Sequence, residues 1–186
     1  MMHQTDFTTI INHSELHRYI LDHGTPATYR RGDIICREGT VCPSVSVVVS
    51  GYFQFSVINS EGKVCITGFS LPGEIATDYV CSFLFGRPSF TSITAGCNTK
   101  VLQVSTGEAR EFLNRTHPEF SASTSQILLV EAYRRYLDLH TKTPKERYVE
   151  LFSRSHNRLS MIPLQEIASY LSVSRRQLQR IRRTIL

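Results

Sequence analysis

The stretch IPLQEIASYLSVSRRQLQRIR, residues 162–182, decides how the C-terminal part of this 186-residue chain folds. Ile167, Ala168 and Leu171 recur at the spacing of one buried helix face. The matching face of a second helix consists of Leu178, Ile181 and Ile185. Small Ala168 lets the two helices cross closely, and Val173 fills the turn between them. The stretch therefore predicts a helix-turn-helix.

The second helix begins at a capping box, in which Ser174 and Gln177 satisfy each other's backbone N–H groups. Burial of its apolar face turns the basic side chains outward, because the helical period fixes their directions. Such a helix suits the major groove of DNA, where a guanidinium can bond guanine bidentately. The candidate DNA-binding residues are Ser174, Arg175, Arg176, Gln179, Arg180 and Arg183. The alternative is a basic helix face that only meets solvent.

The charge of the chain is concentrated at the same end. The whole chain carries 21 Lys and Arg against 16 Asp and Glu, a net charge of +5. Residues 145–186 hold nine positive and three negative side chains and have a net charge of +6, so residues 1–144 have −1. This asymmetry is expected when one end meets a polyanion. No apolar run suits a membrane helix or a signal peptide, so we expect no membrane contact and a cytoplasmic location.

Residues 27–105 have a strand-like pattern, unlike the helical pattern of residues 162–182. Short runs rich in Val, Ile, Phe, Tyr and Thr are separated by glycine turns, at the spacing of about 8 to 12 residues that is typical of a sandwich or barrel. The turn at residues 59–63 closes a hairpin between residues 45–58 and 64–69. The segment predicts a small β-roll.

Helices are expected on both sides of the β-roll. They cover residues 5–22, 106–114, 117–140, 144–154, 164–170 and 175 to near the C-terminus. The long helix, with Pro118 in its first turn, is apolar on more than one face at residues 127–133. Packing against both its own β-roll and a partner copy would explain that pattern. Burial within one subunit is the alternative.

Two sets of motifs, one in the β-roll and one after it in the tail, resemble the Crp/Fnr family of bacterial transcription regulators. One is the pattern I-A-x-x-L-x-V-S-x-x-x-L-x-R-I, which begins at Ile167. The other lies in the β-roll and consists of Tyr29-x-x-Gly32-Asp33, Glu38-Gly39, Val48-Val49-Ser50-Gly51 and Leu71-Pro72-Gly73-Glu74-Ile75-Ala76. The resemblance covers nearly the whole chain.

The resemblance implies an α+β fold in three parts. Residues 1–116 would form a jelly-roll sensor domain with its N-terminal helix, residues 117–141 a dimerisation helix, and residues 142–186 an all-α helix-turn-helix domain without a full wing. It implies a homodimer that binds double-stranded DNA, with an effector pocket in each β-roll, and it admits RNA polymerase as a further partner. Arg175, Arg176 and Arg180 match the positions that read bases in the family.

The tail departs from the family pattern at three points. Arg176 stands where the family often has an acid, so the family's best-known operator is not expected. Ser172 stands where the turn usually has Gly, and a left-handed backbone there would cost Ser about 1 kcal/mol. Without the usual wing, phosphate contacts would come from Lys145, Arg147, Arg154, Arg158 or Arg183.

The β-roll also departs from the family's cyclic-nucleotide binders, in which a Gly-Glu pair opens a short helix and a later Arg pairs with the phosphate. Gly73 and Glu74 are present, but the position of the Arg is occupied by Ser89. A buried phosphate needs a fixed cation, and Ser89 does not supply one. Arg87 is a doubtful substitute because Pro88 follows it. We therefore expect an unknown small-molecule effector, with cAMP disfavoured, or a degenerate pocket. The candidate pocket residues are Gly73, Glu74, Ile75, Ala76, Arg87, Ser89, Phe90 and Thr91.

The sequence does not favour a resident metal or cofactor. The five cysteines, Cys36, Cys42, Cys65, Cys81 and Cys97, have no zinc or iron–sulfur spacing, and we expect them to be structural. His13 and His17 lie one helical turn apart and could chelate a metal, but solvated histidines are the favoured interpretation.

Other function classes fit less well. A cupin-type enzyme needs a His-x-His metal site on its strands, and residues 24–116 contain no histidine, so we expect no catalysis. A sugar-sensing regulator with paired helix-turn-helix motifs would need two of them, and residues 145–186 hold one. The sequence predicts a homodimeric Crp/Fnr-type transcription regulator. The alternative is a signalling or effector-binding subunit whose tail binds protein.

Overall fold

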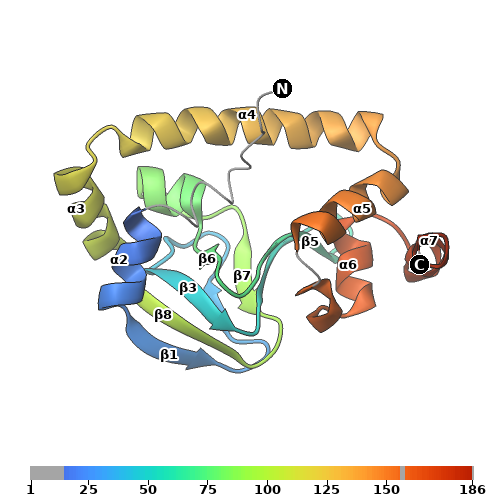
Figure 1. The fold of residues 1–186 in the computed structure, drawn as a ribbon, viewed down its shortest axis with the longest axis horizontal. Coiled ribbons are helices and arrows are strands. Elements are labelled where there is room, and N and C mark those ends of the chain that lie inside the picture. Colours follow the sequence, from blue (N-terminus) through green and yellow to red (C-terminus); the bar gives the residue numbers. More distant parts are fainter. Residues whose placement is uncertain (1–14, 156–157, 186) are drawn as a thin grey trace.

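The computed structural model describes residues 15–155 and 158–185, and Figure 1 shows their arrangement. A roll of two antiparallel sheets lies at the centre. The long helix α4 (Phe120–Thr141) runs along one side of the roll, and a group of short helices follows it at the C-terminal end. The predicted combination of a β-roll, a long helix and an all-α tail is confirmed. No helix in the described ranges combines the length and apolarity needed to cross a bilayer.

Each of the two sheets of the roll has four strands. The first has the order β1 (Thr25–Tyr29), β8 (Thr99–Ser105), β3 (Ser44–Ser50) and β6 (Ile75–Ala76). The second has the order β2 (Ile34–Cys36), β7 (Ser92–Ala95), β4 (Phe53–Ile58) and β5 (Val64–Ser70). Neighbours far apart in sequence, such as β1 and β8, pair antiparallel, which is the jelly-roll arrangement expected from the sequence.

The interior of the roll is filled by small and β-branched side chains. Its buried cluster consists of Ile35, Cys36, Cys42, Val48, Phe53, Ala76, Ile93, Ala95 and Val101. The predicted hairpin joins β4 to β5, and the Asn59 side-chain oxygen accepts hydrogen bonds from the backbone N–H groups of Glu61 and Lys63. The two sheets therefore close over an apolar core, as alternating strand patterns require.

Two helices cover the outer face of the first sheet. They are α2 (Glu15–His23) and α3 (Thr106–Thr116), and Leu16, Ile20, Ala109 and Leu113 pack on Val45, Val47 and Val104. Helix α2 is the described part of the helix expected at residues 5–22, whose first half, with Phe7, Ile10 and Ile11, lies outside the described residues. The chain leaves α2 through Gly24, where a Cβ would approach the Ile20 carbonyl to 2.4 Å.

The long helix begins later than the sequence predicts. His117 and Pro118 form a turn, closed by the Phe120 N–H donating to the His117 carbonyl, and α4 starts at Phe120. Pro118 is therefore outside the helix and not in its first turn. The reason is that the backbone of His117, at φ −142° and ψ 70°, caps α3 and is not helical.

The C-terminal helices are α5 (Pro144–Arg154), the 3-10 turn η2 (Arg158–Met161), α6 (Leu164–Tyr170) and α7 (Arg175–Arg183). Helices α6 and α7 and their turn are the predicted helix-turn-helix. Ala168 and Leu178 are fully buried between them. On the predicted inner face of α7, Leu178 is buried and Ile181 packs, partly buried, against the same cluster. The prediction is wrong for Ile185, which is 38% exposed. Helix α7 ends at Arg183, so Ile185 is no longer held on the helical face.

The turn between α6 and α7 contains the one non-glycine residue with a positive φ in the described ranges. Ser172 has φ 56°, and the following Val173 N–H donates to the Ala168 carbonyl at 3.0 Å. This closure ends α6 in a left-handed turn, a conformation that glycine adopts without the steric cost that a Cβ brings.

We predict that Ser172→Gly raises the free energy of unfolding by about 1 kcal/mol, since it removes the left-handed strain of an exposed serine. Urea denaturation measures the change. Ser153→Gly, in the last turn of α5, is the matched control and should lower stability, because glycine is unfavourable within a helix. A Ser172→Gly protein less stable than the parent would show that the turn is not strained.

Candidate functional site

Helix α7 presents a basic face to solvent. Ser174 caps the helix: its hydroxyl accepts a hydrogen bond from the Gln177 N–H at 3.1 Å, and its own N–H donates to the Gln177 side chain at 2.8 Å. Leu178 points inward and is fully buried. The exposed side chains of the helix include Arg175, Arg176, Gln179, Arg180 and Arg183. The structure thus brings the candidate DNA-binding residues together on one helix, with the Ser174 hydroxyl used in the cap.

The position of α7 depends on how α6 sits against the β-roll. The Ser169 hydroxyl accepts a hydrogen bond from the Ile66 N–H at 3.1 Å, and the rings of Tyr170 and Phe69 lie 5.6 Å apart. The Tyr52 hydroxyl donates to the Glu166 carboxylate at 2.8 Å. One face of α6 therefore rests on β5, and α7 lies on the side away from the roll (Figure 1).

The core beneath this contact is shared by the roll and the C-terminal helices. Tyr52 and Leu71 from the roll are buried in one cluster with Tyr148, Leu151, Leu159, Ile162, Ile167, Ala168, Leu171 and Leu178. The Arg158 guanidinium also donates to the Pro72 carbonyl. The helix-turn-helix is thus attached to its own β-roll through packed side chains as well as through the chain connection.

Burial affects the titration of both partners in the Tyr52–Glu166 contact. It raises the pKa of Tyr52, and the neighbouring Glu166 carboxylate raises it further. Burial also raises the pKa of Glu166, against the lowering effects of the Tyr52 hydrogen bond and of Arg31. The ionised form of Glu166 is consequently less favourable in the folded protein than in the unfolded chain.

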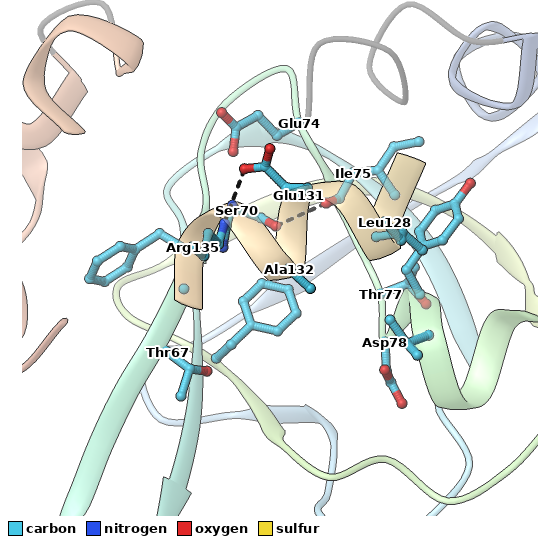
Figure 2. Close-up of a pocket in the computed structure, with 15 residues that line it drawn as sticks. Thr67, Ser70, Glu74, Ile75, Thr77, Asp78, Leu128, Glu131, Ala132 and Arg135 are labelled. Carbon is cyan, nitrogen blue, oxygen red and sulfur yellow. Dashed lines mark hydrogen bonds and ion pairs between the residues drawn. The ribbon is translucent and has the colours of Figure 1, made fainter. Parts of the chain in front are cut away.

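A cavity of about 330 Å³ opens between the β-roll and α4. Figure 2 shows that its wall is built from β5, from the segment around β6 and the start of η1 (Tyr79–Leu84), and from one face of α4. Helix α4 contributes Leu128, Glu131, Ala132 and Arg135. Phe55, Phe69, Ile75 and Val80 make much of the wall apolar. This composition, apolar with a few convergent polar groups, is typical of a small-molecule site.

The polar groups of the cavity are already bonded to one another. The Arg135 guanidinium donates to the Glu131 carboxylate at 3.2 Å, and the Ser70 hydroxyl donates to the Ile75 carbonyl at 2.9 Å (Figure 2). The Asp78 carboxylate accepts from the N–H groups of Cys81 and Ser82, at 3.3 and 3.1 Å. Asp78 therefore caps the first turn of η1.

The structure separates the candidate pocket residues into two groups. Glu74 and Ile75 line the cavity, while Gly73, with φ +85°, makes the adjoining turn and Ala76 is buried in the core of the roll. Arg87, Ser89, Phe90 and Thr91 are not among its lining residues.

The second group has other surroundings. Arg87 and Phe90 are exposed, and Phe90 is 77% accessible. Ser89 is buried, and its hydroxyl donates to the Thr91 carbonyl at 2.8 Å. The Gly-Glu pair also does not open a helix here: the Glu74 carboxylate accepts from the Leu71 N–H at 2.9 Å, and the helical turn begins later, at Tyr79. Sequence reasoning missed the cavity residues of β5 and α4, although the second apolar face of residues 127–133 was a visible signal of the α4 wall.

The described residues contain no group of three or more His, Cys, Asp and Glu side chains that could hold a metal ion. The ring of His17 is 2.9 Å from the Gly73 carbonyl, and His13 lies outside the described residues. All five cysteines are free thiols, of which Cys36, Cys42 and Cys81 are buried.

Comparisons with known proteins show what the fold and the β-roll of this chain are similar to. The fold is that of regulators in which a β-roll is joined by a long helix to a helix-turn-helix. Residues 26–116 match the family model of the cyclic nucleotide-binding domain. A comparison with curated proteins finds no match.

Three solved structures illustrate the likeness. FixK2 from Bradyrhizobium japonicum is 21% identical over 88% of this chain and 84% of that chain, with a TM-score of 0.72. The c-di-GMP responsive global regulator CLP from Xanthomonas campestris is 18% identical over 92% and 90%, with a TM-score of 0.56. The CRP/FNR family regulator TTHA1359 from Thermus thermophilus is 20% identical over 87% and 85%, with a TM-score of 0.56. The resemblance to the Crp/Fnr family is thus confirmed in the fold.

The raised pKa of Glu166 predicts a pH-dependent effect of Glu166→Gln. A carboxyl with a raised folded-state pKa supports folding below its ordinary pKa of 4.5 and loses that contribution as the pH rises through the folded value. Glutamine can still accept from Tyr52 but does not ionise. We expect the stability of Glu166→Gln relative to the parent to increase between pH 4 and pH 7. Urea denaturation across this range measures it, and a relative stability that falls as the pH rises would contradict the assignment.

Proposed function

We propose that this chain is a homodimeric DNA-binding regulator of transcription of the Crp/Fnr type, controlled by a small molecule in the cavity between the β-roll and α4. The observation that carries the proposal is the basic face of α7. It is exposed, capped and held away from the β-roll by α6, so its arginines are free of the roll's surface. No catalytic role is part of the proposal.

The proposed DNA reader is the exposed face of α7. Arg175, Arg176 and Arg180 would contact base edges in the major groove, since bidentate arginine bonds to guanine are the commonest specific contact there. Ser174, Gln179 and Arg183 lie beside them and would contact bases or phosphates. The net charge of +6 in residues 145–186 would add the non-specific attraction of a polyanion.

The proposed dimer interface is the face of α4 turned away from the cavity. Its exposed apolar residues are Leu129, Val130, Tyr133, Tyr136 and Leu137, and Leu129 is 72% accessible. Leu128 and Ala132 face the cavity instead, so the two apolar faces of α4 have separate roles. A contiguous exposed apolar stripe of this kind marks an interaction site. Pairing of two α4 helices would place one α7 in each of two successive major grooves, about 34 Å apart.

The proposed effector is not cAMP. The position expected for a phosphate-binding arginine is Ser89, which is buried and bonded to Thr91, and Arg87 does not line the cavity. A ligand in the cavity would contact α4 directly and could shift the pairing of the two long helices. RNA polymerase remains a partner that the fold suggests for an activator.

The alternative is a subunit whose basic tail binds an acidic protein. DNA binding through several arginines weakens steeply with salt, and log K against log salt has a slope of about −0.9 per phosphate contact. Titration of operator DNA at several salt concentrations separates the two functions.

We predict that Arg175→Ala and Arg180→Ala each weaken binding to a selected operator by about tenfold or more, since a bidentate arginine–guanine pair contributes about 1–3 kcal/mol. Fluorescence anisotropy with the full chain measures the dissociation constants. Arg115→Ala, an exposed arginine at the end of α3, is the matched control and should bind like the parent. Unchanged operator binding by both α7 variants would overturn the assignment of α7 as the reader.

The dimer has a separate test. Replacing Leu129 and Tyr133 together by Asp should convert the protein from a particle of twice 21.2 kDa to one of 21.2 kDa in light scattering, because charges would then be buried in the interface. Leu21→Asp, at an exposed position of α2, should leave the dimer intact. A parent protein that is monomeric at all concentrations, or a dimer that survives the double change, excludes α4 as the interface.

A further inference from the structure

The chemistry of the cavity wall allows the class of effector to be narrowed, and this step rests on the proposed function of the cavity as an effector site. The cavity, about 330 Å³, is near the lower limit for ligand pockets, so its ligand is small. The lining includes the flat rings of Phe55 and Phe69 and the aliphatic side chain of Leu128. An aromatic ring is the ligand group that matches such a wall.

The side of the cavity near η1 is closed to anions. Backbone N–H groups at the start of a helical turn are the usual cradle for a phosphate. Here the Asp78 carboxylate occupies those of Cys81 and Ser82 and also accepts from the Ser82 hydroxyl at 3.0 Å. A phosphate at this place would meet a carboxylate and no available amide, so this wall repels the group that a cyclic nucleotide presents.

The side of the cavity formed by α4 offers little to an anion either. Arg135 is the one cation among the described lining residues, and its guanidinium is bonded to Glu131 at 3.2 Å. The Glu131 side chain is only 15% accessible and lies within 3.9 Å of Arg134 as well. Glu131 holds the Nε–H of Arg135 and offsets its charge, so an anionic ligand at the remaining guanidinium donors would also meet the Glu131 carboxylate.

The ionisable groups of the lining therefore favour a donor over an acceptor. The lining contains three carboxylates, those of Glu74, Asp78 and Glu131, and one guanidinium, that of Arg135. The hydroxyl groups of Thr67, Ser70 and Thr77 add further acceptor oxygens at the wall. A carboxylate has about four acceptor sites, so even Asp78, which accepts three hydrogen bonds, can accept another. An ammonium group has three donors and no acceptor.

We propose that the cavity selects a small alkylammonium ligand that carries an aromatic ring, and excludes phosphate and carboxylate ligands of similar size. The ring lies against Phe55, Phe69 and Leu128, and the amine meets the carboxylates of the wall. Glu131 determines whether the cavity prefers a cation or an anion, because its loss leaves Arg135 without its carboxylate partner in the cavity.

Four commercial probes test the proposal on the full chain without DNA: tryptamine, indole, indole-3-acetate and cAMP, each titrated to millimolar concentration in thermal denaturation and calorimetry. Tryptamine should give a saturable stabilisation and indole a weaker one. Indole-3-acetate and cAMP should give none. A stabilisation by either anion equal to that of tryptamine, or no saturable effect of tryptamine, overturns the proposal.

The variant Glu131→Gln removes the charge of Glu131 and keeps its size, so it tests whether charge determines the ligand preference. It should weaken tryptamine binding about tenfold, the effect of losing one charged hydrogen bond, and should gain binding of indole-3-acetate through the released Arg135. Glu61→Gln, in the exposed β4–β5 turn, is the matched control and should keep the parent's preference. A Glu131→Gln protein with the same preference as the parent contradicts the role of Glu131. Operator binding is measured separately, so failure of the DNA function leaves the ligand result interpretable, and the reverse also holds.

Discussion

The contact between buried Tyr52 and Glu166 is the one on which the placement of the C-terminal helices against the β-roll depends. Tyr52 follows Gly51 at the β3–β4 turn, is fully buried, and donates to Glu166 across the junction between the β-roll and α6. Two glycines make its place possible: a Cβ at Gly51 would approach the Thr99 hydroxyl to 2.5 Å, and one at Gly96 would lie 2.1 Å from the Tyr52 ring. Close packing of this kind fixes where α6 rests, and therefore which way α7 points.

Strand β5 joins this junction to the cavity. Phe69 lines the cavity and also contacts the ring of Tyr170 on α6, and Ser70 and Glu74 continue the same wall. Helix α4 lines the cavity from the other side and presents its second apolar face outward. A molecule in the cavity would thus touch both elements that determine the placement of α7, the strand under α6 and the proposed dimer helix. Coupling between two sites needs such shared, tightly packed elements.

Local sequence signals predicted local structure well. The Ser174–Gln177 capping box, the hairpin turn at residues 59–63 and the left-handed position of Ser172 all follow from interactions within a few residues. The Tyr52–Glu166 contact joins residues 114 positions apart, and no local pattern encodes it. The cavity was only half predicted, with Glu74 and Ile75, because its other walls come from β5 and α4, which the fold brings together. The prediction that Ile185 lies on the buried face of α7 was wrong for a different reason. Helical periodicity holds only as far as the helix extends, and α7 ends at Arg183.

The central claim is that two copies of this chain, paired along α4, read DNA through α7. The most direct measurement is selection of binding sites from random duplex DNA with the full chain, followed by footprinting of the enriched sequences. The account predicts an inverted repeat whose half-site centres are about 34 Å apart, with protection of both major grooves on one face of the duplex. Enrichment of a single half-site, or no enriched sequence with or without added small molecules, would contradict it.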